Sequence, residues 1–307
     1  MRVLIIFFFL SFPCVAEPLI DEFTQQKIPA SGNGIPEVVL QGSQVKNLQY
    51  AKVNGKPLLL DLYLPENVAG SSLVVWVHGG GWKSGTKEKC FVKWLVNFGY
   101  TVASIEYRLV NTAKWPAQIH DCKAAIRWLR ANAKTYGYNQ DCVIAAGASA
   151  GGHLAALLGT TGDCKELEGN VGGHLEQSSR VQAIVDYYGA TDFVLRSKTQ
   201  PSRANASGSV VYNLLGGGAD MLVDKAKQAS AKYHVSDDDP PLLVFHGVDD
   251  TTVLIDQTDA IEAAYTTYDL PVTVYRIENA GHGGSVFYAG ENAEHLCGFL
   301  KTICTEQ

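Results

Sequence analysis

The chain has 307 residues, of which 46% are hydrophobic and 18% charged, a composition typical of soluble globular proteins. Its formal net charge of -6 gives no basic surface of the kind that binds nucleic acid or anionic membranes. The composition therefore argues against a nucleic-acid-binding function, whereas the length alone is compatible with one large α/β domain or two small domains.

The first sixteen residues have the pattern of a secretory signal peptide. Arg2 precedes the apolar run 3–12, which is too short to span a bilayer, and the segment closes with the small residue Ala16. We expect cleavage after Ala16 and a secreted or periplasmic mature chain, residues 17–307, without a membrane span. The alternatives are an uncleaved anchor and a lipoprotein modified at Cys14, which Pro13 disfavours.

Seven cysteines are present, and one of them lies in the leader. The six in the mature chain are Cys90, Cys122, Cys142, Cys164, Cys297 and Cys304. An even number is compatible with disulfides in an exported protein, but the spacing assigns no pairing. No pair has the CxxC spacing of zinc or redox sites, so we expect structural bridges or buried thiols and no metal.

Apolar runs alternate with amphipathic segments along the chain. Residues 17–46 are rich in proline and glycine and are predicted as a loop-rich lead-in. Strands are predicted at 58–64, 73–77, 101–105, 142–146, 181–187, 242–245 and 272–277. Helices are predicted at 88–98, 117–134, 150–158, 219–231, 256–268 and 291–303. This alternation indicates one doubly wound α/β domain with a mostly parallel sheet of about eight strands.

The segment Gly147–Gly151 reads G-A-S-A-G and lies between a predicted strand and a predicted helix. A serine on such a sharp strand–turn–helix bend is exposed above the sheet, and the bend requires the small neighbours found here. The alternative, a phosphate-binding loop, lacks GxGxxG spacing and the lysine of a P-loop. Ser149 is therefore predicted to be a nucleophile that forms an acyl-enzyme.

The buried strand 73–77 runs into His78–Trp82, which reads H-G-G-G-W. Consecutive glycines at a strand end allow backbone N–H groups to face a ligand without obstruction. We expect the N–H groups of Gly80, Gly81 and Ala150 to stabilise a negatively charged oxygen. His78 precedes the serine in the chain and is expected to shape the glycine loop.

A serine nucleophile needs a base, and the base needs an orienting acid, in the order serine, acid, histidine on this architecture. His282 follows the strand 272–277 and is the predicted base. Asp250 follows the strand 242–245 and is the first candidate for the acid, with Asp249 second and Asp192 third. His246 is expected to support the acid loop.

These motifs resemble the hormone-sensitive-lipase-like group of α/β-hydrolases, and within it bacterial bifunctional feruloyl and acetyl xylan esterases. The likeness covers about residues 47–300 and is carried by His78–Trp82, Tyr107–Leu109, Pro116–Ala133, Gly147–Leu158 and Ala280–Gly284. It implies an α/β-hydrolase fold. It also places Asp250 rather than Asp249 in the family's H-G-x-x-D-x-x-V pattern and His282 in its G-H-G position. Little or no cap is expected, because residues 189–240 offer only a polar loop at about 196–209 and one helix.

The resemblance implies a secreted carboxylic ester hydrolase that removes acetyl or feruloyl groups from plant polysaccharide or its fragments, without a metal or organic cofactor. Trp82 either stacks on an aromatic acyl group or packs in the core. One alternative is an amide hydrolase with the same triad, such as an arylformamidase or a serine peptidase. The other is a non-catalytic binding module with the hydrolase fold.

Overall fold

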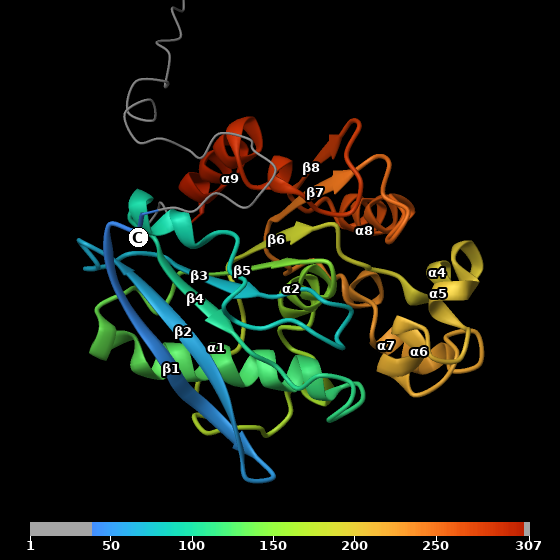
Figure 1. Ribbon diagram of the computed structural model, residues 1–307, viewed down its shortest axis with the longest axis horizontal. Coiled ribbons are helices and arrows are strands. Elements are labelled where there is room, and N and C mark those ends of the chain that lie inside the picture. The colour runs from blue at the N-terminus through green and yellow to red at the C-terminus, as the bar shows by residue number, and fades with distance from the viewer. Residues whose placement is uncertain (1–38, 304–307) are drawn as a thin grey trace, which may run out of the picture.

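An eight-stranded sheet forms the centre of the computed structural model, which describes residues 39–303 (Figure 1). Its strands are β1 (Gly42–Val53), β2 (Lys56–Pro65), β3 (Leu73–Val77), β4 (Thr101–Ile105), β5 (Val143–Ala148), β6 (Ala183–Tyr187), β7 (Leu242–Gly247) and β8 (Val272–Ile277). They are ordered β1-β2-β4-β3-β5-β6-β7-β8. The β1–β2 and β2–β4 pairs are antiparallel and all other pairs are parallel. The predicted α/β-hydrolase fold with a mostly parallel sheet is confirmed.

Helices connect the parallel strands. The α-helices are α1 (Ala117–Tyr136), α2 (Ala150–Thr160), α3 (Lys165–Glu168), α4 (Phe193–Thr199), α5 (Pro201–Ala204), α6 (Val210–Leu215), α7 (Val223–Gln228), α8 (Asp256–Thr267) and α9 (Gly290–Thr302). Short 3-10 helices are η1 (Lys93–Phe98), η2 (Ala231–His234) and η3 (Ser285–Phe287). In Figure 1 helices α4 to α7 lie together at one side of the sheet.

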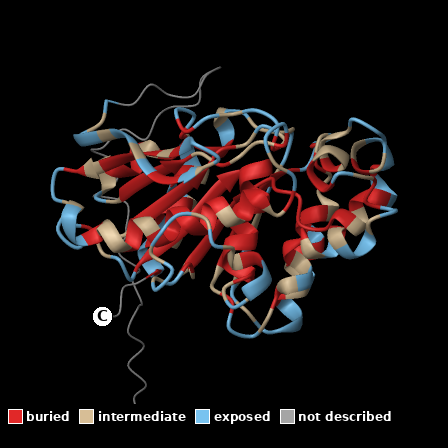
Figure 2. Cartoon of the chain, turned by 90° about the horizontal axis from the view of Figure 1, so that it is seen from below, coloured by how far each residue is buried: buried red, intermediate tan, exposed pale blue. Residues whose placement is uncertain are grey.

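A hydrophobic core lies on each face of the sheet, and successive side chains of a strand point alternately into the two cores. In β3, Leu73, Val75 and Val77 belong to one core with residues of α1, α2 and α8, whereas Val74 and Trp76 belong to a second core with η1 and α9. Figure 2 shows the strands as a buried layer through the middle of the molecule. Burial on both faces explains the continuous apolar runs of the central strands.

Several predicted segments differ from the structure, and of the predicted helix 219–231 only residues 223–228 are α-helical. Residues 42–46, predicted as part of a loop, belong to β1, an edge strand whose pairing is interrupted by two register shifts. Of the predicted helix 88–98 only residues 93–98 are helical. The backbone carbonyl of Lys89 accepts a hydrogen bond from the Trp76 indole N–H instead of from a helical partner. The predicted polar loop 196–209 contains most of α4 and all of α5.

Of the cysteines within residues 39–303, Cys142 is disulfide-bonded, and the thiols of Cys90, Cys122, Cys164 and Cys297 are free. Burial raises the pKa values of Cys90 and Cys297 to about 12, so both thiols remain protonated at neutral pH. The predicted signal peptide, residues 1–16, lies outside the described residues. Among the helices described here, none has the length and apolarity needed to cross a membrane.

Candidate active site

The candidate site lies at one edge of the sheet, where four parallel strands end. Strands β3, β5, β7 and β8 run in the same direction, so the segments that follow them emerge on the same side. These segments carry the glycine loop 78–82, Ser149, Asp250 and His282. Residues from all four segments, including Ser149 and His282, line a cavity of about 610 Å³.

Ser149 occupies the bend between β5 and α2 in a conformation that is rare for a non-glycine residue, with φ 56° and ψ -116°. Its backbone N–H donates to the carbonyl of Tyr187 at 2.8 Å. The close turn leaves no room for side chains, since a Cβ at Gly151 would lie 1.9 Å from the carbonyl oxygen of Val77. The small residues in the motif are thus required by the bend that exposes the serine.

The glycine loop presents backbone donors to the same cavity. Gly80 has a φ of +114°, and a Cβ there would lie 2.2 Å from the carbonyl oxygen of Ser84, so a larger residue would disrupt the loop. Within residues 39–303 the N–H groups of Gly80 and Gly81 donate to no protein acceptor. Ala150 is the first residue of α2, where a backbone N–H has no partner within the helix. The three predicted donors therefore line one cavity with their N–H groups unused.

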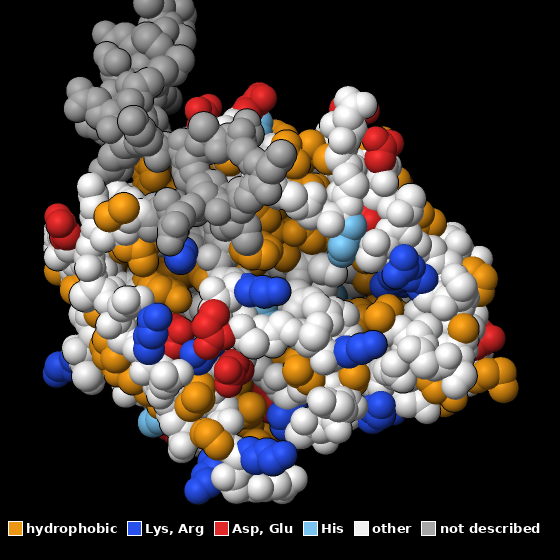
Figure 3. Space-filling view, viewed as in Figure 1, with side chains coloured by type: hydrophobic (Ala, Val, Ile, Leu, Met, Phe, Trp, Pro, Cys, Tyr) orange, Lys and Arg blue, Asp and Glu red, His pale blue; other side chains and the backbone are white. Residues whose placement is uncertain are grey.

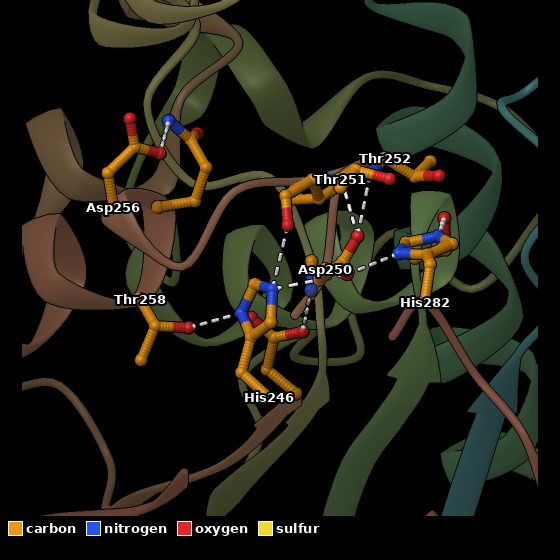
Figure 4. Close-up of polar contacts among 12 residues, drawn as sticks. His246, Asp250, Thr251, Thr252, Asp256, Thr258 and His282 are labelled. Carbon is orange, nitrogen blue, oxygen red and sulfur yellow. Dashed lines mark hydrogen bonds and ion pairs between the residues drawn. The ribbon is translucent and has the colours of Figure 1, made fainter. Parts of the chain in front are cut away.

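Ser149, His282 and Asp250 form a continuous hydrogen-bonded chain. His282 Nε2 lies 2.8 Å from Ser149 Oγ, and His282 Nδ1 lies 2.6 Å from Asp250 Oδ2. Because a carboxylate only accepts, Nδ1 carries the proton and Nε2 accepts from the serine hydroxyl. Figure 4 shows the Asp250 carboxylate directed at the His282 ring. The structure thus brings together the three residues that the sequence singled out from separate strand ends.

The Asp250 carboxylate is buried, and hydrogen-bond donors surround it. Oδ1 accepts from the backbone N–H groups of Thr252 at 2.7 Å and Val253 at 2.9 Å. Burial acts to raise the pKa of Asp250, but hydrogen bonds from His246, His282 and Val253 outweigh it and hold the pKa well below its ordinary value. Asp250 therefore stays ionised and keeps a fixed negative charge behind His282.

His246, at the end of β7, lies on the side of Asp250 away from the serine. Its Nε2 is 3.3 Å from Asp250 Oδ2 and 2.9 Å from the Val253 carbonyl oxygen, while Nδ1 is 2.6 Å from Thr258 Oγ1 (Figure 4). Since Nε2 faces two acceptors, it carries a proton and donates to them. His246 fixes both the carboxylate and the loop that follows it, in agreement with the supporting role predicted for it.

The alternative acids lie elsewhere. Asp249 is exposed, and its backbone N–H donates to the Ala280 carbonyl. Asp192 caps α4 by accepting from the Leu195 N–H, and its other oxygen pairs with Lys232 at 2.9 Å. No hydrogen bond or ion pair of the described residues joins either carboxylate to His282. Geometry selects Asp250.

His78 and His153 have structural contacts. His78 Nδ1 contacts the Gly79 carbonyl at 2.8 Å, and its ring stacks on Tyr107. His153 is fully buried; its Nδ1 accepts from the Trp82 indole N–H, and burial lowers its pKa to about 4. Trp82 is only 2% exposed and also packs against Phe193, so its indole is fixed in the core with part of it lining the cavity.

Other residues of the cavity had no role in the sequence predictions. Tyr188 packs edge-on against the His282 ring at 4.8 Å, and its hydroxyl meets that of Tyr288 at 2.5 Å. Arg196 and Arg203, from α4 and α5, also line the cavity. Tyr188 follows strand β6 and lies in the stretch 186–193, which also fits the family resemblance, although no role was predicted for it. Arg196 and Arg203 lie in the segment 196–209 that was predicted as a loop, and nothing in the sequence pattern marked them.

The sheet order and the serine–histidine–aspartate arrangement define an α/β-hydrolase. The model of the BD-FAE family matches residues 60–265, more than half of the chain. The chain belongs to the BD-FAE family.

Curated relatives of the chain include two proteins of Mycobacterium tuberculosis. Esterase LipC is 30% identical over 75% of this chain and 58% of its own length. The probable carboxylic ester hydrolase LipM is 31% identical over 62% of this chain and 44% of its own length. The chain thus spans about half the length of these relatives.

Two solved structures of carbohydrate esterases have a TM-score of 0.77 to this chain. One is a truncated carbohydrate esterase from gut microbiota, 26% identical, with 90% of this chain and 99% of that chain covered. The other is a bifunctional GH43-CE protein of Bacteroides eggerthii, 31% identical, with 84% of this chain and 35% of that chain covered. The similarity therefore extends over almost the whole described chain.

Proposed function

We propose that this protein is a serine carboxylic ester hydrolase that acts through an acyl-enzyme. The observation that carries the proposal is the hydrogen-bonded chain from Ser149 Oγ through His282 to Asp250, which opens into a cavity lined by unused backbone donors. Family membership and relatives named as esterases support the reaction type.

In the first half of the reaction, His282 Nε2 takes the proton of Ser149 Oγ as that oxygen attacks the ester carbonyl carbon. The resulting imidazolium stays bound to ionised Asp250, which stabilises its charge. His282 then gives the proton to the leaving alcohol oxygen as the C–O bond breaks, and the acyl group remains on Ser149. A water molecule repeats the attack, with His282 again taking and returning the proton.

The carbonyl oxygen gains negative charge in each tetrahedral intermediate. The N–H groups of Gly80, Gly81 and Ala150 line the cavity beside Ser149 and are proposed to donate to this oxygen. Each removed donor of this kind typically reduces turnover by about 10²–10³-fold. The glycine loop is held in this conformation by hydrogen bonds from the N–H groups of Lys83 and Ser84 to the Gly80 carbonyl, each at 3.1 Å.

As substrates we propose acetyl or feruloyl esters of plant polysaccharide or its fragments. Support comes from the resemblance to feruloyl and acetyl xylan esterases and from the similarity to the two carbohydrate esterase structures. The cavity of about 610 Å³ has a volume within the range typical of small-molecule sites. Export is part of the proposal, resting on the leader pattern of residues 1–16 and compatible with the oxidised state of Cys142.

The test compares hydrolysis of p-nitrophenyl acetate, methyl ferulate and N-formylkynurenine by the purified protein. We expect turnover of one or both esters and stoichiometric labelling of Ser149 by a fluorophosphonate. A clear preference for the formamide would replace the ester assignment by amide hydrolysis. A folded protein that is neither labelled nor active would favour a non-catalytic binding module.

A further inference from the structure

Positive charge gathers in the candidate active site although the whole chain is acidic, with a net charge of -6. Lys83, Lys89, Arg196 and Arg203 line the cavity that contains Ser149, and none of its lining residues is an aspartate or glutamate. Figure 3 shows several Lys and Arg side chains on one face of the molecule, with Asp and Glu side chains among them. A cavity with charges of one sign attracts ligands of the opposite sign.

The cations elsewhere in the described chain that are buried or bridge helices are largely paired with carboxylates. Buried Arg127 pairs with Glu168, Arg108 with Asp121 at 2.7 Å, and Lys87, close to the cavity residues in sequence, with Asp61 at 3.0 Å. Within residues 39–303 none of the four cavity cations forms an ion pair. The difference indicates that their charges are available to a ligand.

Among these four cations Arg196 is the best candidate for binding a ligand, because this residue is only 2% exposed and still lines the cavity. Its guanidinium donates from Nε to Gln200 at 3.1 Å and from Nη2 to the Thr252 carbonyl at 2.7 Å. Both bonds hold the planar group in place, and Nη1 donates to no acceptor in the described part of the chain. A buried guanidinium without a carboxylate partner is costly to desolvate.

Arg203 stands close enough for its charge to act on Arg196. Burial and the positive charge of Arg203 together lower the pKa of Arg196 to about 10, while Asp250 and Asp256 act in the opposite direction. Arg196 therefore remains protonated at neutral pH beside a second cation. The Arg203 side chain makes no hydrogen bond within residues 39–303, so an anion between the two guanidiniums would relieve their repulsion.

We propose that the cavity selects esters that carry a carboxylate group, which Arg196 and Arg203 bind while Ser149 attacks the ester. This inference rests on the proposed function and narrows its substrate class. Guanidinium groups bind carboxylates through charge-assisted hydrogen bonds, and Nη1 of the fixed Arg196 side chain has no acceptor among the described residues. Lys83 and Lys89 are exposed and add to the attraction of an anion toward the mouth of the cavity.

The carboxylate can belong to the alcohol or to the acyl part of the substrate, and two matched pairs separate these sources. Methyl 2-O-acetyl-glucuronoside and methyl 2-O-acetyl-glucoside differ only in carboxylate against hydroxymethyl on the alcohol. Monoethyl succinate and ethyl levulinate differ in carboxylate against acetyl on the acyl chain. We expect kcat/KM about tenfold or more in favour of the charged member of one pair, falling with added salt.

The Arg203→Gln variant should lower that ratio by about tenfold, since one charge-assisted contact is lost. Arg196→Lys keeps the charge but removes the planar fork, and should also lower the ratio. Lys46→Gln, which removes an exposed positive charge on β1, is the matched control and should leave the ratio unchanged. Melting temperatures of all three variants establish that they fold.

Ratios near one in both pairs, or a preference that neither arginine substitution alters, would overturn this inference. If the neutral esters are still hydrolysed in that case, the proposed esterase function stands. If no ester is hydrolysed and Ser149 is not labelled by a fluorophosphonate, the proposed function fails and the inference fails with it.

Discussion

The rim of the sheet and the β6–β7 segment, residues 188–241, contribute to one cavity in opposite ways. At the rim, the charged carboxylate of Asp250 is surrounded by donors, and its partner His282 is bonded at both ring nitrogens. In the segment, Arg196 and Arg203 stand on helices of seven and four residues and present charge without a carboxylate partner in the described chain. We infer that reaction chemistry is built on strand ends and substrate preference on short helices.

The largest expected effect comes from removing the Ser149 hydroxyl at the rim of the sheet. Ser149→Ala removes the nucleophile, and kcat for p-nitrophenyl acetate should fall by about 10⁶-fold, the scale typical of triad nucleophiles. The melting temperature should change little, because the serine hydroxyl bonds only to His282 among the described residues. A variant that folds and retains more than a small fraction of activity would contradict the role of Ser149.

The next effect concerns the acid. Asp250→Asn keeps the shape but removes the charge that stabilises the His282 imidazolium, and kcat should fall by about 10⁴-fold. Asp249→Asn is the matched control: its neighbouring carboxylate is exposed, and activity should stay within about twofold of wild type. Equal losses in both variants would show that the geometry around Asp250 does not decide the acid.

A smaller loss is expected at His246, which acts only through Asp250. His246→Ala removes a donor to the carboxylate, and kcat should fall by about 10–100-fold with KM nearly unchanged. Because that donor lowers the pKa of Asp250, its loss should raise this pKa. His246→Gln, which can still donate, should restore much of the activity. An increase in KM alone would place His246 in substrate binding instead.

The rim was predictable because each of its parts imposes a local constraint on the sequence. The bend at Ser149 requires small residues at fixed positions, and the buried strand before it is a short apolar run. Even so, the strand-end position alone left Asp249 close behind Asp250; the family's pattern favoured Asp250, and the fold shows that Asp250 is buried and Asp249 exposed.

The segment was not predictable for the opposite reason. Helices α4 and α5 are too short for a helical period to appear in the sequence, and tertiary contacts such as the Asp192–Lys232 ion pair hold them. Strand β1 was not predicted for a related reason: it is an exposed edge strand with two register shifts, so its hydrophobic residues do not alternate with a regular period of two. Charges available in the cavity are therefore visible only once these elements are placed.

The smallest effect sharpens the comparison through stability. Asp186 on β6 and Asp239 in the segment both lie in the described core, and burial raises the pKa of each to about 6. A carboxyl whose pKa is higher in the folded state binds its proton more tightly there. The free energy of unfolding therefore receives its full contribution below pH 4 and loses it as the pH rises from about 4 to 6.

Asp186→Asn replaces one such carboxyl by an amide that does not titrate, and so removes its contribution to the pH dependence of stability. A shift of about two pKa units corresponds to roughly 3 kcal/mol, so the variant should lose about 2 kcal/mol less stability than wild type between pH 4 and pH 7. Asp239→Asn should have an effect of similar size, because burial outweighs the bonds donated by the Ser236 N–H and hydroxyl and raises that pKa to about the same value. Urea unfolding at each pH measures both differences. If the free energy of unfolding of Asp186→Asn differs from that of wild type by a constant amount across this range, the pKa of Asp186 is not raised by folding. Asp186 would then be ionised in the folded protein as a buried charge.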